Sequence, residues 1–187
     1  MNRMKMQKGV GMVEVLVALL VLALGVLGYV ALQLRAVDAS AEALSKSQAM
    51  LIMRGLAEDI RSNPQAFAEY PVRVREYSNY SADTAEPSTC MNTACTAVNM
   101  ATFDAYQAAK NAHQYGMKIT MENCPGVTPA MALRRQCLFI FWGKTEPKRT
   151  TVTAEDGTET TTIDASECMQ GNGTYVDGAS CLMMEAY

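Results

Sequence analysis

Histidine is nearly absent from this chain, since His113 is the single histidine among 187 residues. A Ser-His-Asp arrangement would have only this one candidate base, which we interpret as a surface residue at the polar end of a helix. The chain also lacks the G-x-x-x-x-G-K-[ST], H-E-x-x-H and G-x-S-x-G signatures of common active sites. Glu58 and Asp59 adjoin on a predicted helix and point in different directions, so they form no dyad. We expect no enzyme activity and no cofactor.

Basic residues are not in excess either. The chain has 16 lysines and arginines against 19 aspartates and glutamates, for a formal charge of −3. Three of the basic residues, Arg3, Lys5 and Lys8, precede the rest of the chain, whose formal charge is −6 without them. A chain with a net negative charge lacks the excess of basic residues with which proteins bind the phosphates of nucleic acids. We therefore expect no direct nucleic-acid binding. The length suits one anchor and one modest domain.

Cysteine is present in an even number. The six cysteines all follow the long apolar run, at Cys90, Cys95, Cys124, Cys137, Cys168 and Cys181. An even count suits disulfides in an oxidising compartment. Six cysteines allow fifteen pairings and the sequence does not choose among them, but we favour the three local pairs: Cys90–Cys95, Cys124–Cys137 and Cys168–Cys181. The alternative is a zinc site, which is disfavoured because no C-x-x-C occurs and the single histidine is poorly placed.

The longest apolar run lies near the amino terminus. Val15 to Leu32 form eighteen residues without a charge, which is enough for a helix to span a bilayer. Basic residues before the span predict a cytoplasmic amino terminus and an external remainder. Glu14 lies at the edge of this run. A carboxylate there is costly without a partner, so we interpret Glu14 as functional.

Three known kinds of amino-terminal segment could account for residues 1–34. A secretory signal peptide would use the Ala-Ser-Ala at 39–41, but that site lies too far beyond the apolar run, with charged residues between. A lipoprotein signal requires a cysteine after the run, and none is there. A plain single-pass anchor fits the apolar run but does not explain the five-residue spacing between Gly9 and Glu14.

A short basic leader, Gly9, and Glu14 five residues later resemble the class III signal of type IV prepilins. The resemblance implies cleavage after Gly9 by prepilin peptidase, a mature chain starting at Val10, and N-methylation of Val10. This chain has valine where pilins most often have phenylalanine. In the family, the glutamate at mature position five is thought to pair with the amino-terminal ammonium of a neighbouring subunit. Here Glu14 would pair with the amine of Val10, since each charge needs a partner in hydrocarbon.

The same resemblance implies three parts of the chain. Residues 1–9 would be the prepilin leader, residues 10–34 the transmembrane and later filament-core half of a long helix, and residues 35–187 a globular domain in the periplasm or outside the cell.

The long helix is predicted to continue beyond the apolar run. Asn63-Pro64 should end it, because the residue before proline is pushed away from helical geometry. The helix would then have about fifty residues and a length of about 80 Å at 1.5 Å per residue. Apolar positions recur at three- and four-residue steps, which predicts one buried stripe: Leu34, Val37, Ala41, Leu44, Gln48, Leu51, Ile52, Leu56 and Ile60.

The rest of the chain is predicted as one helix and several strands. Residues 65–95 are interpreted as an irregular connector, with tyrosines that pack rather than form a binding surface, namely Tyr70, Tyr77 and Tyr80. Residues 97–114 have a helical pattern, and 165–187 are predicted as loop. Four strands are predicted. Apolar and polar residues alternate over 117–122, and 137–142 is a compact apolar run that suits a central strand. A Glu-Asp-Gly turn lies between the other two strands, 150–154 and 158–163. Acidic segments 155–159 and 171–178 lack the ligand spacing of a calcium site and are interpreted as turns.

A long amino-terminal helix against a small antiparallel sheet, with a cysteine-bounded carboxyl-terminal loop, resembles the pilin fold, an α+β class. Within that family the chain is similar to the PilV-type minor pilins, also called type IV pilus modification proteins. The similarity lies in Gly11 to Leu19, in Leu24-Gly25-Val26-Leu27-Gly28, in Phe103-Asp104-Ala105-Tyr106 and in the strand ending at Trp142.

The resemblance implies a minor pilin, a structural subunit that primes assembly and lies at or near the tip of a type IV pilus. It would support adhesion, twitching motility or DNA uptake. Its partners would be other minor and major pilins, prepilin peptidase, the inner-membrane assembly platform and a tip adhesin. It would lie in the inner membrane before assembly and in the extracellular pilus afterwards. The alternatives are a pseudopilin of a type II secretion system and a single-pass periplasmic protein.

Overall fold

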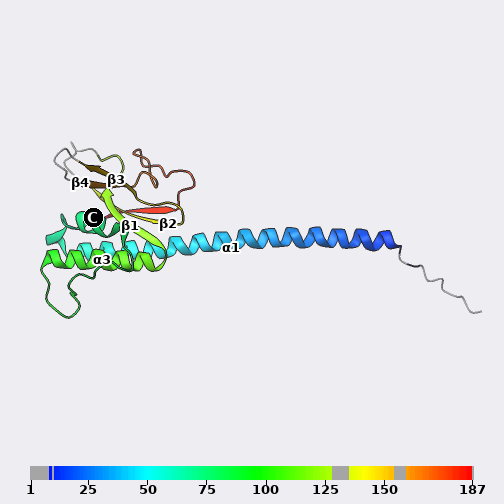
Figure 1. The fold of residues 1–187 in the computed structure, drawn as a ribbon, viewed down its shortest axis with the longest axis horizontal. Coiled ribbons are helices and arrows are strands. Elements are labelled where there is room, and N and C mark those ends of the chain that lie inside the picture. The colour runs from blue at the N-terminus through cyan, green and yellow to red at the C-terminus, as the bar shows by residue number, and fades with distance from the viewer. Residues whose placement is uncertain (1–8, 10, 128–134, 154–158, 187) are drawn as a thin grey trace, which may run out of the picture. The chain divides into compact units, whose positions relative to one another are not determined.

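A computed structural model describes residues 9, 11–127, 135–153 and 159–186. The chain divides into two compact units, Met1–Ala43 and Leu44–Tyr187. Helix α1, Met12–Ser62, has residues in both units and contains 51 residues (Figure 1). It ends one residue before Asn63-Pro64, so the predicted end and length are confirmed.

The buried face of α1 differs from the predicted stripe. Leu34, Val37, Leu44 and Leu51 are exposed, each by more than half of its side-chain surface. The face that packs in the second unit lies about a third of a turn away and consists of Ala49, Met53, Leu56, Ala57 and Ile60. Only Leu56 and Ile60 of the predicted stripe belong to this buried set, so the prediction is wrong for most of its members.

The segment after α1 is more ordered than predicted. It contains the short helices η1 (Pro64–Ala66), α2 (Tyr70–Glu76) and η2 (Tyr77–Asn79). A proline in the first turn of α2 suits its amino end, where the missing N–H is no loss. Tyr70, Pro71 and Val74 are buried. An irregular connector therefore occupies only the part from Tyr80 to Thr96.

Helix α3, Ala97–Gln114, has the bounds that the sequence pattern predicts. The hydroxyl oxygen of Thr96 accepts a hydrogen bond of 3.2 Å from the backbone N–H of Asn99, which caps the helix. At the other end, Gly116 has a φ of 67°, a left-handed conformation that glycine adopts without strain. Figure 1 shows α3 next to the last part of α1, and residues of both helices belong to one hydrophobic core.

Three strands form an antiparallel sheet in the order β1-β2-β5. The strands are β1 (Met117–Asn123), β2 (Gln136–Trp142) and β5 (Cys181–Ala186). The predicted strands at 117–122 and 137–142 are confirmed, and the second is central. The carboxyl-terminal segment was predicted as loop, and this is wrong for the residues of β5, which pair along most of β2.

Strands β3 (Lys148–Thr153) and β4 (Glu159–Asp164) form a separate two-stranded sheet. This agrees with the predicted hairpin, although its Glu155-Asp156-Gly157 turn lies outside the described residues. A guanidinium N–H of Arg149 donates to the hydroxyl of Ser78 at 2.8 Å and so ties β3 to η2. The Ser78 hydroxyl in turn donates to the carbonyl of Arg75.

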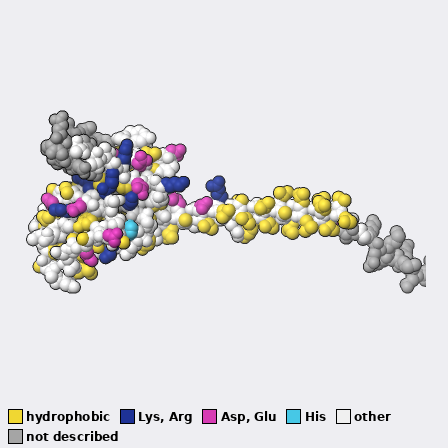
Figure 2. All heavy atoms as spheres, in the orientation of Figure 1, with side chains coloured by type: hydrophobic (Ala, Val, Ile, Leu, Met, Phe, Trp, Pro, Cys, Tyr) yellow, Lys and Arg dark blue, Asp and Glu magenta, His cyan; other side chains and the backbone are white. Residues whose placement is uncertain are grey.

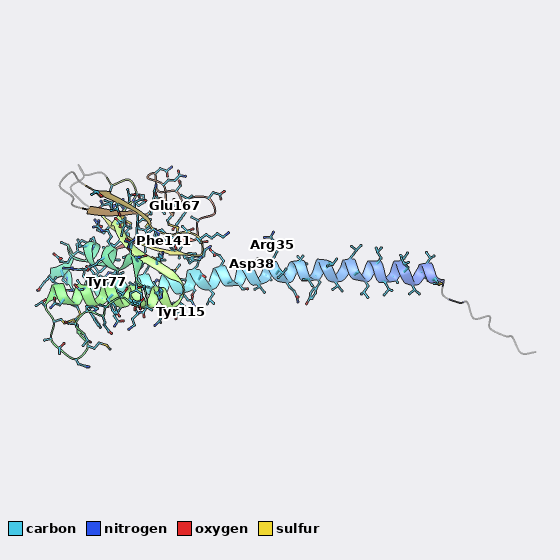
Figure 3. All side chains as sticks on the ribbon, in the orientation of Figure 1. Arg35, Asp38, Tyr77, Tyr115, Phe141 and Glu167 are labelled. Carbon is cyan, nitrogen blue, oxygen red and sulfur yellow. A yellow bond between two sulfur atoms is a disulfide. The ribbon has the colours of Figure 1, made fainter. Side chains whose placement is uncertain are left out.

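The two faces of the three-stranded sheet bound two hydrophobic cores. Leu138, Ile140 and Trp142 of β2 belong to the core shared with the helices. Phe139 and Phe141 belong to the second core, together with the cysteines of β2 and β5. Of the two phenylalanines, Figure 3 labels Phe141. Alternate residues of a strand point to opposite faces, so β2 contributes to both cores.

Candidate processing and assembly site

The amino-terminal site begins with two exposed glycines. Gly9 and Gly11 precede the first residue of α1, and a Cβ at either position would have no atom within 4 Å among its neighbours. The carbonyl of Gly11 accepts hydrogen bonds from the backbone N–H groups of Glu14 at 3.0 Å and Val15 at 3.3 Å. Leader residues 1–8 and Val10 lie outside the described residues. The described part places Gly9 just outside the helix.

Glu14 lies in the first turn of α1 with its side chain exposed. A carboxylate in the first turn is favoured by the partial positive charge of the helix amino terminus. Within the described residues, Glu14 has no hydrogen bond or ion pair to another side chain. The predicted partner, the amine of Val10 on another subunit, is therefore not tested by the structure, and the pairing stays a prediction.

The helix that follows presents an apolar surface. Every residue of α1 from Met12 to Ala41 is exposed, and Figure 2 shows hydrophobic side chains along the visible face of this part. An 18-residue window of α1 has a mean hydropathy of 2.8 and no buried residue, so by length and composition the helix can cross a membrane. The next charged residues are Arg35 and Asp38, labelled in Figure 3.

The six cysteines come together as three disulfides. Cys90–Cys95, Cys124–Cys137 and Cys168–Cys181 are each bonded, and these are the three local pairs favoured from the sequence. The second pair joins the residue after β1 to β2. The third joins the loop before β5 to its first residue. Both pairs lie in the second hydrophobic core, whereas Cys90–Cys95 closes a surface loop before α3.

One partly buried carboxylate lies between the sheet and α2. A carboxylate oxygen of Glu122, on β1, lies 3.9 Å from a guanidinium nitrogen of Arg75. The Thr120 hydroxyl donates to Glu122 Oε1 at 2.9 Å. Burial raises the pKa of Glu122 to about 7; the hydrogen bond from Thr120 and the charge of Arg75 lower this pKa, whereas Asp164 raises it. The arrangement links α2 to the three-stranded sheet within the second unit.

The connector tyrosines pack as predicted. Tyr70 is fully buried. The rings of Tyr77 and Tyr80 each contact Tyr106 edge-on, with centroids 5.5 Å apart. His113 is exposed near the end of α3, with its ring centroid 5.3 Å from that of Tyr80, in agreement with the interpretation as a surface residue.

Metal ligands do not cluster in the part of the chain that the structure describes: no group of three or more His, Cys, Asp or Glu side chains could hold a metal ion there. The 171–178 segment forms turns, with the Asn172 side chain accepting from the backbone and hydroxyl of Thr174. The 155–159 segment lies almost wholly outside the described residues.

A groove between α1 and α3 was not anticipated from the sequence. It has a volume of about 400 Å³ and includes the exposed side of α1 around Gly55. The one sequence signal that would have indicated it is the glycine itself, because glycine destabilises a helix interior relative to alanine.

Two family models match adjacent segments of the chain, which together span residues 4–106. The prokaryotic N-terminal methylation motif matches residues 4–30, and the Tt1218-like family of type IV pilins matches residues 31–106. No curated protein and no solved structure matches.

The α+β fold and the amino-terminal motif define a pilin-like structural subunit. The family matches support the assignment of the chain to the type IV pilin superfamily. Pilins are structural and not enzymatic, so the prediction that the chain is not an enzyme is confirmed. A type IV pilin assembles with other pilins and is processed by prepilin peptidase. The methylation motif and the apolar helix indicate membrane anchoring followed by incorporation into a pilus.

Proposed function

We propose that this chain is a minor pilin of a type IV pilus, a subunit that primes assembly and lies at or near the tip. The observation that carries the proposal is the position of Glu14, a lone carboxylate in the first turn of an exposed apolar helix, five residues after Gly9. Prepilin peptidase would cut between Gly9 and Val10 and the new Val10 amine would be methylated. This ammonium would meet Glu14 of a neighbouring subunit, since each charge is costly when buried alone.

Before assembly, residues 10–34 would cross the inner membrane, with the amino terminus in the cytoplasm and residues 35–187 in the periplasm. The three disulfides support an oxidising compartment for the globular part. After assembly, the apolar segments of several subunits would pack in the filament core. The assembly platform, other minor and major pilins and a tip adhesin would be the partners in this sequence of events.

We also propose the PilV-type subgroup, which rests on the resemblance of short sequence segments, among them Phe103 to Tyr106. The Phe103-Asp104-Ala105-Tyr106 segment lies on α3, where Phe103, Ala105 and Tyr106 are buried. Asp104 accepts a hydrogen bond from Tyr70. The roles in adhesion, twitching motility or DNA uptake would follow from a place near the tip. A pseudopilin of a type II secretion system would use the same amino-terminal chemistry.

The proposal is tested by Glu14→Ala in the full-length chain expressed in its own cells. We expect normal cleavage but a loss of about tenfold or more of the subunit from sheared filaments, because a buried ammonium would lose its partner. Normal incorporation of this variant would contradict the pairing.

Deleting the gene should reduce surface pili and leave type II secretion intact, whereas loss of secretion with intact pili would favour the pseudopilin.

A further inference from the structure

The three disulfides of this chain differ in their surroundings. Cys90 and Cys95 are only partly buried, and among the described residues they belong to neither hydrophobic core. Met91, next to Cys90, is 76% exposed. The other four cysteines lie in the second core and are at most 5% exposed. A thiolate from solvent can therefore approach the Cys90–Cys95 bond in the folded chain, whereas side chains of the core cover the other two bonds.

The exposed disulfide closes a stretch that has little else to hold it. Residues 81–95 form no helix or strand, and none of them belongs to either core in the described part of the chain. Their hydrogen bonds to described residues join members of the same stretch, such as the 2.6 Å bond from the Thr93 hydroxyl to the Thr89 carbonyl. In Figure 1 the stretch is the loop that leads into the start of α3 and projects away from the sheets. Its conformation therefore depends on the disulfide.

The rest of the domain keeps its contacts when this bond opens. Helix α3 retains its Thr96 cap and its buried residues, and the Asn63 side chain still donates to the Ala97 carbonyl at 2.8 Å. The loop between the two cysteines is also short, with a sequence separation of 5 against 13 for each of the other pairs, so its closure restricts the unfolded chain less. Opening a buried pair would instead require local unfolding of the sheet that covers it.

The position of Cys95 makes it the better leaving group of the two sulfurs. Cys95 directly precedes Thr96, the N-cap of α3, and the first turn of α3 has no acidic residue. The partial positive charge at the amino terminus of a helix favours a thiolate nearby. Exchange is faster when the departing sulfur is more stable as a thiolate. Cys90 lies five residues earlier, in the irregular stretch, so an incoming thiolate is expected to attack Cys90 and to release Cys95.

We propose that Cys90–Cys95 is a thiol–disulfide exchange site, which a protein dithiol opens while the rest of the domain stays folded. One thiolate of the dithiol attacks the sulfur of Cys90, and the bond to Cys95 breaks with its electron pair on Cys95. The second thiolate of the dithiol then attacks the first in the mixed disulfide and releases Cys90. Each thiol of the dithiol loses one proton and each cysteine gains one, so two electrons pass to the cysteine pair and the dithiol ends as a disulfide. The reduced form frees residues 81–95, and the reverse reaction closes them.

The test is graded reduction of the oxidised full-length chain in detergent with dithiothreitol, followed by alkylation and peptide mass spectrometry. We expect Cys90 and Cys95 to be alkylated about tenfold faster, or more, than the other four cysteines. Hydrogen exchange should then rise in residues 81–95 and stay unchanged in β1, β2 and β5. Equal rates for the three disulfides, or earlier opening of a buried one, would overturn the proposal. Unchanged exchange in 81–95, or faster exchange throughout the sheet, would overturn it as well.

The direction of attack has its own test. Glutathione, a monothiol, stops at the mixed disulfide; we expect it on Cys90 after rapid alkylation, and a majority on Cys95 would contradict the assigned direction. Asn99→Asp places a carboxylate in the first turn of α3 and should slow opening by about twofold to fivefold, although it stabilises the helix. Asn111→Asp makes the same charge change at an exposed site near the other end of α3 and should leave the rate unchanged. Equal rates in the two variants would contradict the role of the helix terminus.

Discussion

The hydroxyl of Tyr70 donates a hydrogen bond of 2.7 Å to Oδ2 of Asp104 and so joins α2 to α3. The same hydroxyl accepts from the Asn63 side chain at 3.3 Å, next to the end of α1. Burial raises the pKa of both Tyr70 and Asp104. One fully buried phenol therefore connects the three helices that form the helical side of the core.

Replacing Tyr70 with Phe should destabilise the globular domain by about 1 to 3 kcal/mol, because Asp104 and Asn63 lose a hydrogen-bond partner in a partly buried site. The measurement is the free energy of unfolding by chemical denaturation. Tyr115→Phe is the matched control, since Tyr115 is 53% exposed, and it should change stability by less than about 0.5 kcal/mol. Equal effects of the two substitutions would contradict the role of the Tyr70 hydroxyl.

Buried and exposed leucines of α1 should differ in what they contribute to stability. Leu56→Ala removes a buried side chain and should cost about 2 to 5 kcal/mol of unfolding free energy. Leu51→Ala, five residues earlier on α1 and 67% exposed, should cost less than about 0.5 kcal/mol. A large loss of stability from Leu51→Ala would show that this residue is covered within its own domain.

Glu122 should make stability fall as pH rises through the window from about 4.5 to 7. Its pKa is raised from 4.5 to about 7 in the fold, so the folded state binds a proton that the unfolded state releases. The stability associated with the protonated carboxyl is present below pH 4.5 and is lost as pH rises through 7. Solvent access and Arg75 screen the charge, so we expect a change of about 1 to 2 kcal/mol.

Glu122→Gln should remove this pH dependence, because the amide cannot ionise and can still accept from the Thr120 hydroxyl. Asp59 and Asp104 also have raised pKa values, and their contributions remain in the variant at lower pH. Unfolding free energies measured at pH 5 and pH 8 test the prediction. An unchanged difference between the two pH values in Glu122→Gln would rule out Glu122 as the cause.

The Cys168–Cys181 disulfide should contribute more to stability than Cys90–Cys95. Its loop is longer, with a sequence separation of 13 against 5, and both of its cysteines are buried in the second core. We expect removal of the pair by double substitution to alanine to cost about 3 kcal/mol or more, against about 2 kcal/mol for Cys90–Cys95. Melting of both double variants under oxidising conditions provides the comparison; a reversed order would contradict it.

Local signals in the sequence are sufficient to predict several helices and strands. The bounds of α3 follow from eighteen residues of helical periodicity with Thr96 as a cap and Gly116 just beyond the end. The end of α1 follows from Asn63-Pro64. The central position of β2 follows from its continuous apolar run, which serves two faces. In each case, local geometry and burial favour the same structure.

Other features depend on tertiary contacts that the sequence does not encode locally. Strand β5 has no alternating pattern and is defined by its pairing with β2. Helix α2 has only seven residues, too few for a clear period. The predicted stripe on α1 is wrong for most of its members because Leu44, Gln48 and Leu51 have the same spacing as the buried residues Ala49, Met53 and Leu56. Periodicity alone cannot say which of the two sets the domain covers. The roles of Gly9, Val10 and Glu14 stay predictions.

The most direct measurement of the central claim is the mass of the mature amino-terminal peptide, isolated from cells with active prepilin peptidase. The account predicts a chain that begins at Val10, with one additional methyl group on its nitrogen, and a Gly9→Val variant that keeps the leader and stays in the inner membrane. A chain of unaltered sequence that still begins at Met1 in such cells would contradict the assignment as a processed pilin.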